Sequence, residues 1–429
     1  MREIFTLTVI LIFCLEISSA QDVSDSTKAA AKAGRNCEPQ AIGDLFRKKD
    51  KAPKPPKTFS ALILPNISSN PTNGFILGVG GAFGWYMGDK NTTRVSGAPF
   101  TVAVTSKKQM ISFVKTNIYT NANKFFLQGD LRFYLYSQPT FGLGTNAPDT
   151  AGLPSGFHWE GQGGPDDSAS FPMKFNYIKV HEIVNKKIVE NFYAGIGYHL
   201  DYYYAIKDEK LVITTEDTLN TPHFYYSTKY DFNTSKYLIS GLSANVVYDS
   251  RDNMINPYKG IYANINYRYN FNFLGSVQDA SSLWMEFRTY VPLSQRKPRH
   301  LVAFWLFGDF NLTGHLPYLT LPALGGDQRA RSGRGYINGR FRGKNLVYGE
   351  AEWRFPISQC SQILGGVLFV NAVSTDNPNR DVGLFEYIQP AVGFGIRVMV
   401  NKYFRTNINL DFAIGRKTSG FYFSGQETF

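Results

Sequence analysis

The stretch LPALGGDQRARSGRGYINGRFRGKNLVYGEAEWRFPI, residues 321–357, is the most informative part of the chain. Its first part is a glycine-rich loop that carries five arginines, Arg329, Arg331, Arg334, Arg340 and Arg342. Its last part alternates with a period of two, so that apolar residues from Val347 onward share one face and Glu350, Glu352 and Arg354 share the other. Many arginines beside a strand with a charged face predict a loop that folds back against that face inside an enclosure.

The rest of the chain predicts the strands of such an enclosure. No apolar run after the N-terminus approaches the ~18 residues of a membrane-spanning helix, and the aromatic share of 15% favours strands. After Thr58, alternating segments are separated by turn residues, as residues 258–271 and 403–415 illustrate. One face of each is apolar and aromatic and the other is rich in Asn, Arg and Asp, which is typical of a transmembrane barrel.

The pattern predicts an all-β membrane protein, an antiparallel transmembrane β-barrel of about 16 strands at residues 59–429. The predicted strands are 59–67, 74–88, 99–106, 110–120, 125–137, 173–184, 189–206, 236–249, 258–271, 282–293, 300–313, 345–357, 363–374, 388–400, 403–415 and 420–429. From the fifth strand onward, most connections alternate between long and short, as extracellular loops and periplasmic turns do. Both chain ends are therefore predicted on the periplasmic side.

The N-terminus carries a targeting signal. Arg2 precedes the apolar run 4–15, and Ser18 and Ala20 suit cleavage before Gln21. We predict a signal peptide at 1–20 and a short periplasmic tail or linker at 21–58, which is too short for a stable domain of its own. The predicted location is the outer membrane of a Gram-negative bacterium.

Two cysteines remain after removal of the signal peptide, too few for a disulfide-stapled fold. Cys37 lies in the tail, and Cys360 lies in the turn after the twelfth predicted strand. The alternation of long and short connections places both cysteines on the same side of the membrane, the oxidising periplasm. We hypothesise a disulfide between them; the alternative is two free thiols.

Charge and motif content bear on other function classes. The formal net charge is +11, but Lys and Arg are spread along the chain without a compact patch, so no nucleic-acid partner is expected. Plain solvation and attraction to an anionic membrane surface both account for the charge. The histidines show no metal-ligand spacing, and no nucleophile elbow or phosphate loop occurs. We expect no enzyme activity, no catalytic residue, no metal and no cofactor.

Several motifs together resemble the BamA/TamA family of outer-membrane insertases and translocases, in the bacterial surface antigen superfamily. The loop core GRGY (Gly333 to Tyr336), followed by GRFRGKN and YGEAEWRFPI, is similar to a sixth extracellular loop whose Arg-Gly-aromatic tip enters the barrel lumen. The same family is indicated, in the expected order, by FGLGTNAPD (141–149), YDSRDNMINPYKG (248–260), GFGIR (393–397) and the final Phe429.

The resemblance implies a lumen loop lock formed by Arg334, Gly335, Tyr336, Glu352 and Asn371. Arg334 would pair with lumen-facing groups of the twelfth and thirteenth predicted strands, and alternation places Glu352 toward the lumen. Asn371 stands where the family usually has Asp. This departure implies a softened lock.

The last predicted strand resembles a C-terminal insertion signal. Phe421, Phe423 and Phe429 alternate along it, and the resemblance implies a terminal aromatic on the lipid face. In the insertases, the first and last strands meet at a weak seam that opens so that a client strand pairs with its edge. Here the seam would join 59–67 to 420–429.

The implied partners are outer-membrane lipid and lipopolysaccharide, with client β-barrel proteins or a periplasmic partner. The family's insertases carry periplasmic POTRA domains, which the tail 21–57 cannot house, so the chain resembles a POTRA-less branch. One hypothesis is outer-membrane protein assembly or translocation through the seam. The alternative is a passive pore or structural barrel without insertase activity, and a third is a subunit whose client-binding domains lie on another polypeptide.

Overall fold

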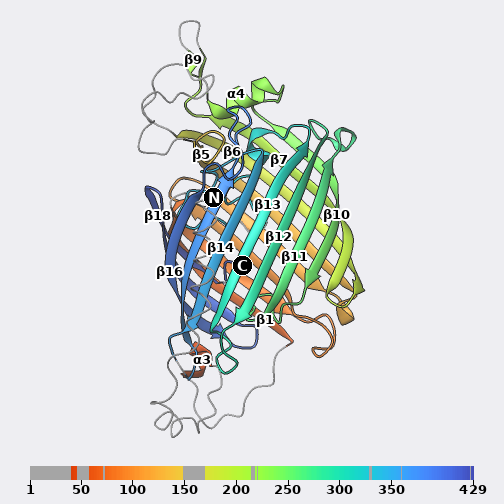
Figure 1. The fold of residues 1–429 in the computed structure, drawn as a ribbon, viewed down its shortest axis with the longest axis vertical. Coiled ribbons are helices and arrows are strands. Elements are labelled where there is room, and N and C mark those ends of the chain that lie inside the picture. The colour runs from red at the N-terminus through yellow and green to blue at the C-terminus, as the bar shows by residue number, and fades with distance from the viewer. Residues whose placement is uncertain are drawn as a thin grey trace, which may run out of the picture. The chain divides into compact units, whose positions relative to one another are not determined.

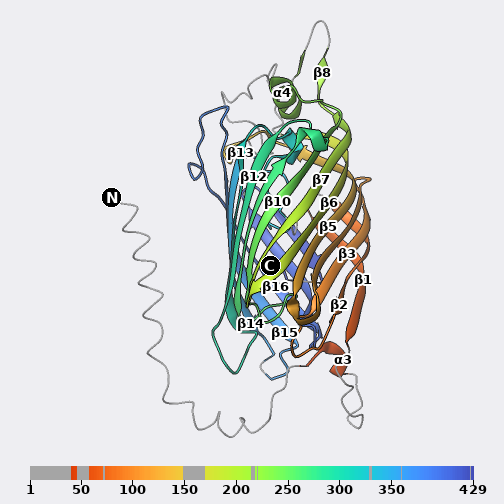
Figure 2. The same cartoon turned by 90° about the vertical axis from the view of Figure 1, so that its right-hand side faces the viewer.

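Sixteen strands form one antiparallel sheet that curls into a barrel in the computed structural model (Figures 1 and 2). The structure describes residues 40–45, 58–70, 73–147, 170–213, 218–219, 221–327, 331–358, 360–425 and 427–429. Each strand of the sheet pairs with the next one along the chain. The topology is therefore an up-and-down barrel, and the predicted all-β fold with 16 antiparallel strands is confirmed.

The sheet contains β1 (Phe59–Asn70), β2 (Gly74–Trp85), β3 (Ser96–Thr105), β4 (Met110–Tyr119), β5 (Phe125–Thr140), β6 (Phe171–Val189), β7 (Phe192–Asp208), β10 (Tyr237–Asp249), β11 (Gly260–Asn270), β12 (Ala280–Pro292), β13 (Leu301–Thr313), β14 (Asn345–Pro356), β15 (Leu364–Thr375), β16 (Gln389–Asn401), β17 (Thr406–Gly415) and β18 (Thr418–Ser424). Each coincides with one predicted strand, with ends shifted by a few residues. Outside the sheet lie the helices α3 (Ile42–Leu45) and α4 (Pro222–Lys229), the hairpin of β8 (Val212–Ile213) and β9 (Thr218–Leu219), and 3-10 turns at Asn121–Asn123, Asn272–Leu274 and Tyr318–Thr320.

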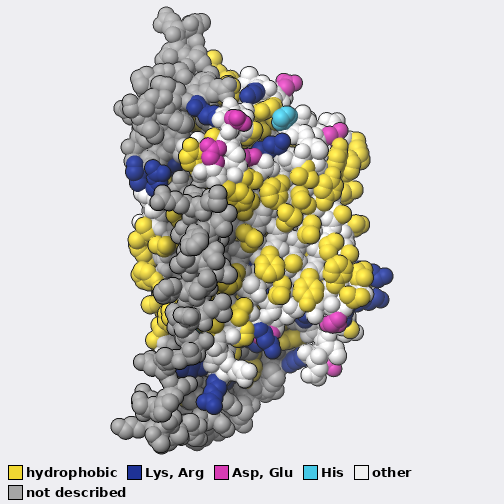
Figure 3. Space-filling view, viewed as in Figure 1, with side chains coloured by type: hydrophobic (Ala, Val, Ile, Leu, Met, Phe, Trp, Pro, Cys, Tyr) yellow, Lys and Arg dark blue, Asp and Glu magenta, His cyan; other side chains and the backbone are white. Residues whose placement is uncertain are grey.

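Strand alternation gives the barrel an apolar outer face. On β16, Val392, Phe394 and Ile396 point outward and are about half exposed, whereas Arg397 is buried in the lumen. Figure 3 shows hydrophobic side chains in a broad band across the strands, with charged side chains mainly toward the two ends. Such a band is the lipid-facing surface of a transmembrane barrel. Among the described helices, none is both long and apolar enough to cross a membrane.

Long connections gather at one end of the barrel and short turns at the other (Figures 1 and 2). The long connection between β7 and β10 contains α4, which begins after Thr221. The Thr221 side chain accepts a hydrogen bond from the Phe224 N–H at 3.2 Å, and Pro222 occupies the first helical turn, as N-terminal capping favours. At the short-turn end, α3 lies against the turns, because Asp44 pairs with Lys402 at 3.3 Å.

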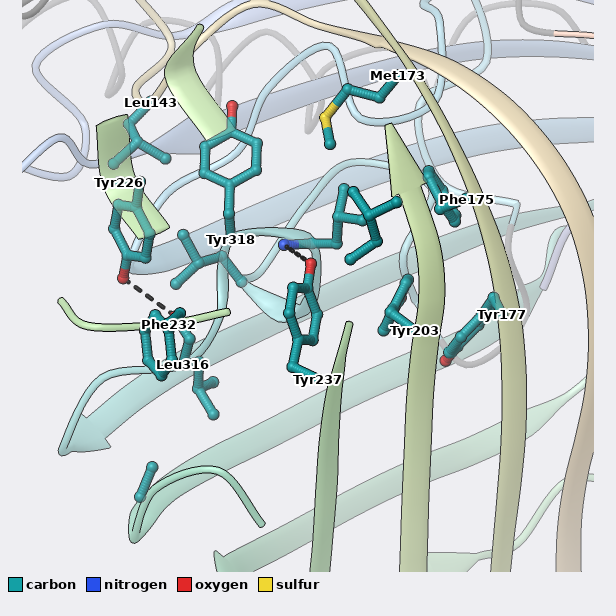
Figure 4. Close-up of a cluster of buried hydrophobic side chains, with 14 residues drawn as sticks. Leu143, Met173, Phe175, Tyr177, Tyr203, Tyr226, Phe232, Tyr237, Leu316 and Tyr318 are labelled. Carbon is teal, nitrogen blue, oxygen red and sulfur yellow. Dashed lines mark hydrogen bonds between the residues drawn. The ribbon is translucent and has the colours of Figure 1, made fainter. Parts of the chain in front are cut away.

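An aromatic cluster packs beneath α4 at the long-loop end (Figure 4). The Tyr226 hydroxyl donates to the Leu316 carbonyl at 3.1 Å, and the Tyr237 hydroxyl accepts from the Leu319 N–H at 3.0 Å. The buried members are Leu143, Met173, Phe175, Tyr177, Tyr203, Ile206, Tyr226, Phe232, Tyr237, Ala280, Leu316, Tyr318, Leu319 and Leu321. This cluster fixes the start of the β13–β14 loop against the barrel wall.

The first and last strands form an unpaired seam. β1 lies beside β18, yet within the described chain no β-ladder joins them, so both are edges of the sheet. β18 has only seven residues, against twelve in β1. Near the short-turn end, the Asn401 side chain donates to the Ser60 hydroxyl at 3.1 Å.

The C-terminal residues leave the sheet and enter the lumen. β18 ends at Ser424, and Phe429 is only 1% exposed; the C-terminus lies within the barrel in both views (Figures 1 and 2). The prediction that Phe429 faces lipid is therefore wrong. A strand continued to Phe429 would place the Glu427 carboxylate on the lipid face, where a charge is costly. Phe421 faces outward and is 47% exposed, and Phe423 is partly buried.

The predicted signal peptide and most of the tail lie outside the described residues. Cys360 is disulfide-bonded, whereas Cys37 is not among the described residues, so the Cys37–Cys360 pairing stays a prediction. Gln40 is the first described residue after Cys37. Its N–H donates to the carbonyl of Ser361 at 2.8 Å, which brings the chain just after Cys37 beside Cys360.

We expect non-reducing proteolysis of the purified chain to release one peptide pair that joins Cys37 to Cys360 and separates on reduction. The proximity of Gln40 and Ser361 is the physical reason. Mass spectrometry identifies the pair, and a Cys37→Ser chain is the control. Two free thiols in material prepared without reductant would contradict the prediction.

Candidate functional site

The β13–β14 loop, residues 314–344, enters the barrel and places its tip on the inner wall. Gly335 has φ +102°, and its N–H donates to the Tyr422 hydroxyl at 2.9 Å. A Cβ at this position would lie 3.0 Å from the Ala391 Cβ and 3.1 Å from the Gly415 nitrogen. Only glycine combines this backbone conformation with so close an approach to the wall.

Arg334 is surrounded by three carboxylates from two strands. Its Nη1 donates to Asp411 Oδ2 at 2.7 Å, and its Nη2 contacts one oxygen each of Glu350 and Glu352. The guanidinium carbon also lies 3.4 Å from the Phe369 ring centroid. Arg334 is 4% exposed, so these charge-assisted hydrogen bonds and the cation–π contact act in a desolvated environment.

The surroundings keep Arg334 charged. Burial by itself lowers the pKa of the guanidinium, but Glu350, Glu352 and Asp411 raise it well above its ordinary value. Arginine is already protonated at every physiological pH. The loop lock therefore cannot be released by titration of Arg334.

The structure brings Arg334 and Glu352 together but gives Asn371 another role. The Asn371 side-chain N–H donates to the backbone carbonyl of Arg334 at 3.0 Å and makes no bond to the guanidinium. Glu350 and Asp411 supply further acids beside the guanidinium, and the softened lock stays a prediction. Alternation had already placed Asp411 on the polar face of its strand, but its proximity to Arg334 depends on the curvature of the barrel.

The lock belongs to a longer chain of alternating charges. Arg354 Nε donates to Glu352 at 2.6 Å, and Arg397 binds Asp411. Arg397 Nε also donates to Glu427 at 2.7 Å. In order, the chain is Arg354, Glu352, Arg334, Asp411, Arg397 and Glu427.

The C-terminus completes this chain. Phe429 packs against Trp305 and Tyr290 with ring centroids 5.5 and 6.1 Å apart, and Arg354 Nη2 donates to a Phe429 carbonyl oxygen at 3.2 Å. Arg331 of the loop contacts the Glu427 carbonyl. The loop and the chain terminus thus occupy the lumen together, a role that sequence reasoning missed for Glu427, Arg397 and Phe429.

Tyr336 fixes the loop tip to a second part of the wall. Its hydroxyl donates to the Pro390 carbonyl at 2.6 Å and accepts from the Arg416 N–H at 3.2 Å. Its ring meets Phe341 edge-on at 5.0 Å. The predicted lock residues Arg334, Gly335 and Tyr336 therefore all contact the lumen wall.

The motif that begins at Phe141 supports the same loop from the long-loop end. The Gly144 N–H donates to the Arg342 carbonyl at 2.7 Å, and Arg340 Nη2 donates to the Ala147 carbonyl at 2.8 Å. The Arg340 guanidinium also lies over the Phe141 ring at 4.5 Å. Two of the loop's other arginines thus stabilise loop–loop contacts.

The chemistry of the site is that of a structural lock. The carboxylates around Arg334 are engaged by arginines. In the part of the chain that the structure describes, no group of three or more His, Cys, Asp or Glu side chains is placed to hold a metal ion.

Residues 145–429 match the model of the Omp85 superfamily domain. The chain belongs to the Omp85 superfamily. Together with the sixteen-stranded sheet, this match confirms the BamA/TamA-type barrel that the motifs predicted. In Gram-negative bacteria, barrels of this family lie in the outer membrane. No curated protein matches the chain.

One solved structure supports the fold, and two others are similar to a lesser degree. This Omp85 barrel is similar to BamA from Haemophilus ducreyi lacking POTRA domains 1–3, with a TM-score of 0.50 and 14% identity over 85% of this chain and 69% of that one. CdiB from Acinetobacter baumannii gives a TM-score of 0.49 and 14% identity over 85% of this chain and 59% of CdiB. CdiB from Escherichia coli gives 0.48 and 8% over 88% and 62%. The chain thus spans about three fifths of each CdiB structure.

We expect Arg334→Met to destabilise the folded barrel by about 3–5 kcal/mol, because it leaves buried carboxylates without their shared cation. The measurement is the temperature at which the barrel unfolds in detergent, read from its heat-dependent migration on gels. The control is Arg296→Met, an exposed arginine in the β12–β13 turn. Equal unfolding temperatures for the two variants would contradict the lock.

Phe429→Ala should destabilise the barrel by about 3–5 kcal/mol, since it empties a buried aromatic site. The matched control is Phe421→Ala on the lipid face, which should cost less. Urea unfolding of both variants, followed by tryptophan fluorescence, compares the losses. A larger loss for Phe421→Ala would contradict the lumenal role of the terminus.

Proposed function

We propose that this Omp85 barrel assembles or translocates proteins at the outer membrane through the seam between β1 and β18. The observation that supports the proposal is the pair of adjacent strand edges, between which the described part of the chain forms no β-ladder. Edge strands present unpaired backbone N–H and C=O groups, which in lipid cost several kcal/mol each. A client strand that pairs with such an edge by β-augmentation satisfies these groups.

The two edges differ in a way that suits this role. β1 offers twelve residues along the seam, whereas β18 offers seven. The shorter edge is held from inside by the Tyr422 hydroxyl bound to Gly335. The Arg334 lock keeps the inner wall fixed while the β1 side moves.

In this proposal the short-turn end, where α3 lies against the turns, faces the periplasm of a Gram-negative cell. The proposed partners are client β-barrel proteins, a periplasmic protein that delivers them, and the lipids and lipopolysaccharide around the barrel. The passive-pore alternative is less well supported, because the loop and the C-terminus occupy part of the lumen.

We expect disulfides engineered across the seam to abolish client assembly in cells. Cysteine pairs scanned between β1 and β18 lock the edges. The control pair Leu62→Cys and Ala82→Cys joins strands that are already paired in register. Levels of folded outer-membrane proteins, with and without reductant, are the readout.

Two results would overturn the proposal. One is normal client assembly by a seam-locked chain in which the crosslink is complete. The other is a steady solute conductance in planar bilayers that is unchanged by the lock, which would favour the passive pore.

A further inference from the structure

A cavity of about 510 Å³ remains in the lumen beside the β13–β14 loop. The loop lies against the inner wall of β14 to β18, where Arg334 and Tyr336 find their partners, and leaves space toward β1 to β4. On β2, the lumen-facing Gly78, Gly80 and Ala82 add little or no side-chain volume. The cavity therefore exists because the loop fills one side of the lumen and small residues line the other.

The wall on the β1 side of the seam is uncharged, which is unusual for a barrel interior. The strands β1, β2 and β3 contain no Asp, Glu, Lys, Arg or His. Leu62 and Leu64 of β1 line the cavity, and so do Ile76 of β2 and Ile111 of β4. Aliphatic side chains that line a water-filled lumen stay in contact with water, whereas an apolar ligand in the same place would bury their surface.

The opposite wall changes abruptly to charged and aromatic side chains. The boundary is the cross-strand pair Phe113 and Arg132, both of which line the cavity. Lys179 is the neighbour of Arg132 on β6. These two cations share one carboxylate, since Asp130 lies 2.6 Å from Arg132 and 3.0 Å from Lys179.

Cations outnumber carboxylates on the cavity surface, although Arg268 and Arg334 are already paired with carboxylates. The lining cations are Arg132, Lys179, Arg268, Arg331, Arg334 and Arg342, and the lining carboxylates are Asp201, Asp309 and Asp411. Asp130 and Asp327 lie close to Arg132 and Lys179 and lower their excess charge, but Lys115 adds a third cation to this group, so cations still exceed carboxylates by one. The wall next to the aliphatic side chains is thus suited to an anionic group.

We propose that this cavity binds a single-chain anionic amphiphile, with its acyl chain against β1 to β4 and its carboxylate or phosphate at Arg132 and Lys179. The volume lies in the lower half of the roughly 300–1,000 Å³ typical of small-molecule sites, which suits one acyl chain better than a two-chain phospholipid. This inference does not depend on insertase activity.

The ligand enters sideways from the bilayer. The cavity is lined from both edges of the seam, by Leu62 and Leu64 of β1 and by the lumen-facing Tyr422 and Ser424 of β18. Because no ladder joins these strands, a hydrocarbon chain passes between them without breaking backbone hydrogen bonds. A free fatty acid and a lysophospholipid share the required chemistry, and the test separates them.

The test is native mass spectrometry of the full chain released from detergent, with palmitate as probe and hexadecanol as its uncharged match. Lys179→Gln should weaken palmitate binding by roughly tenfold or more, because it removes a charged hydrogen-bond donor. The exposed Lys186→Gln on the same strand is the control. Lipid that co-purifies with the protein, without added probe, is extracted and identified in parallel. A fatty acid or a lysophospholipid in this extract identifies the natural ligand.

The acyl-chain wall is tested by filling it. Ala82→Trp and Thr101→Phe point into the cavity and should abolish palmitate binding. Val79→Trp, on the lipid face of the same strand, should not. Heat-dependent migration on gels shows which variants fold, and two independent filling variants keep the test decisive if one fails to fold.

Three outcomes would overturn the proposal. Equal retention of palmitate and hexadecanol would show that the negative charge contributes nothing to binding, and so would contradict the anionic site. Palmitate binding unchanged in folded Ala82→Trp and Thr101→Phe would place the lipid outside the barrel. Co-purification of two-chain phospholipid alone, displaced by neither filling variant, would show annular lipid only.

Discussion

The inner structure of the barrel depends on the buried guanidinium of Arg334. Three carboxylates converge on it from β14 and β17. Glu352 and Asp411 also pair with Arg354 and Arg397, whereas Glu350 would lose its cation in a desolvated site without Arg334. This need for a partner holds the loop inside, while Gly335 lets the backbone approach the wall. The same charge chain continues to Glu427 and draws the C-terminus into the lumen.

This internal anchoring leaves the two halves of the barrel unequal. Strands β14 to β18 contact the loop and the C-terminus, whereas β1 to β3 contain no charged residue that could join this ion-pair network. The seam falls between these two regions, where no ladder joins the described residues of β1 and β18. Local opening is easiest where backbone hydrogen bonds are fewest, so the proposed protein and ligand routes both lie there.

Much of the fold follows from local pattern. Alternation fixes which face of a strand meets lipid, and each of the sixteen strands was predicted within a few residues. The resemblance of the loop core GRGY to the family's lumenal loop implied that Arg334 enters the lumen, and alternation placed Glu352 on the lumen face of β14. Together they predicted that the two meet. The fate of Phe429 was not predicted, since alternation alone does not show where a strand stops.

The sequence by itself determined the barrel, its strand faces and the identity of the loop, because period-two alternation and glycine-arginine loop chemistry are local properties. Only the tertiary structure decided which acids surround Arg334. Asp411 lies 77 residues from it in sequence, and curvature of the closed sheet brings them together. The tertiary structure also decided the open seam, the inward turn after Ser424 and the two-sided cavity, because each depends on how distant strands share one lumen.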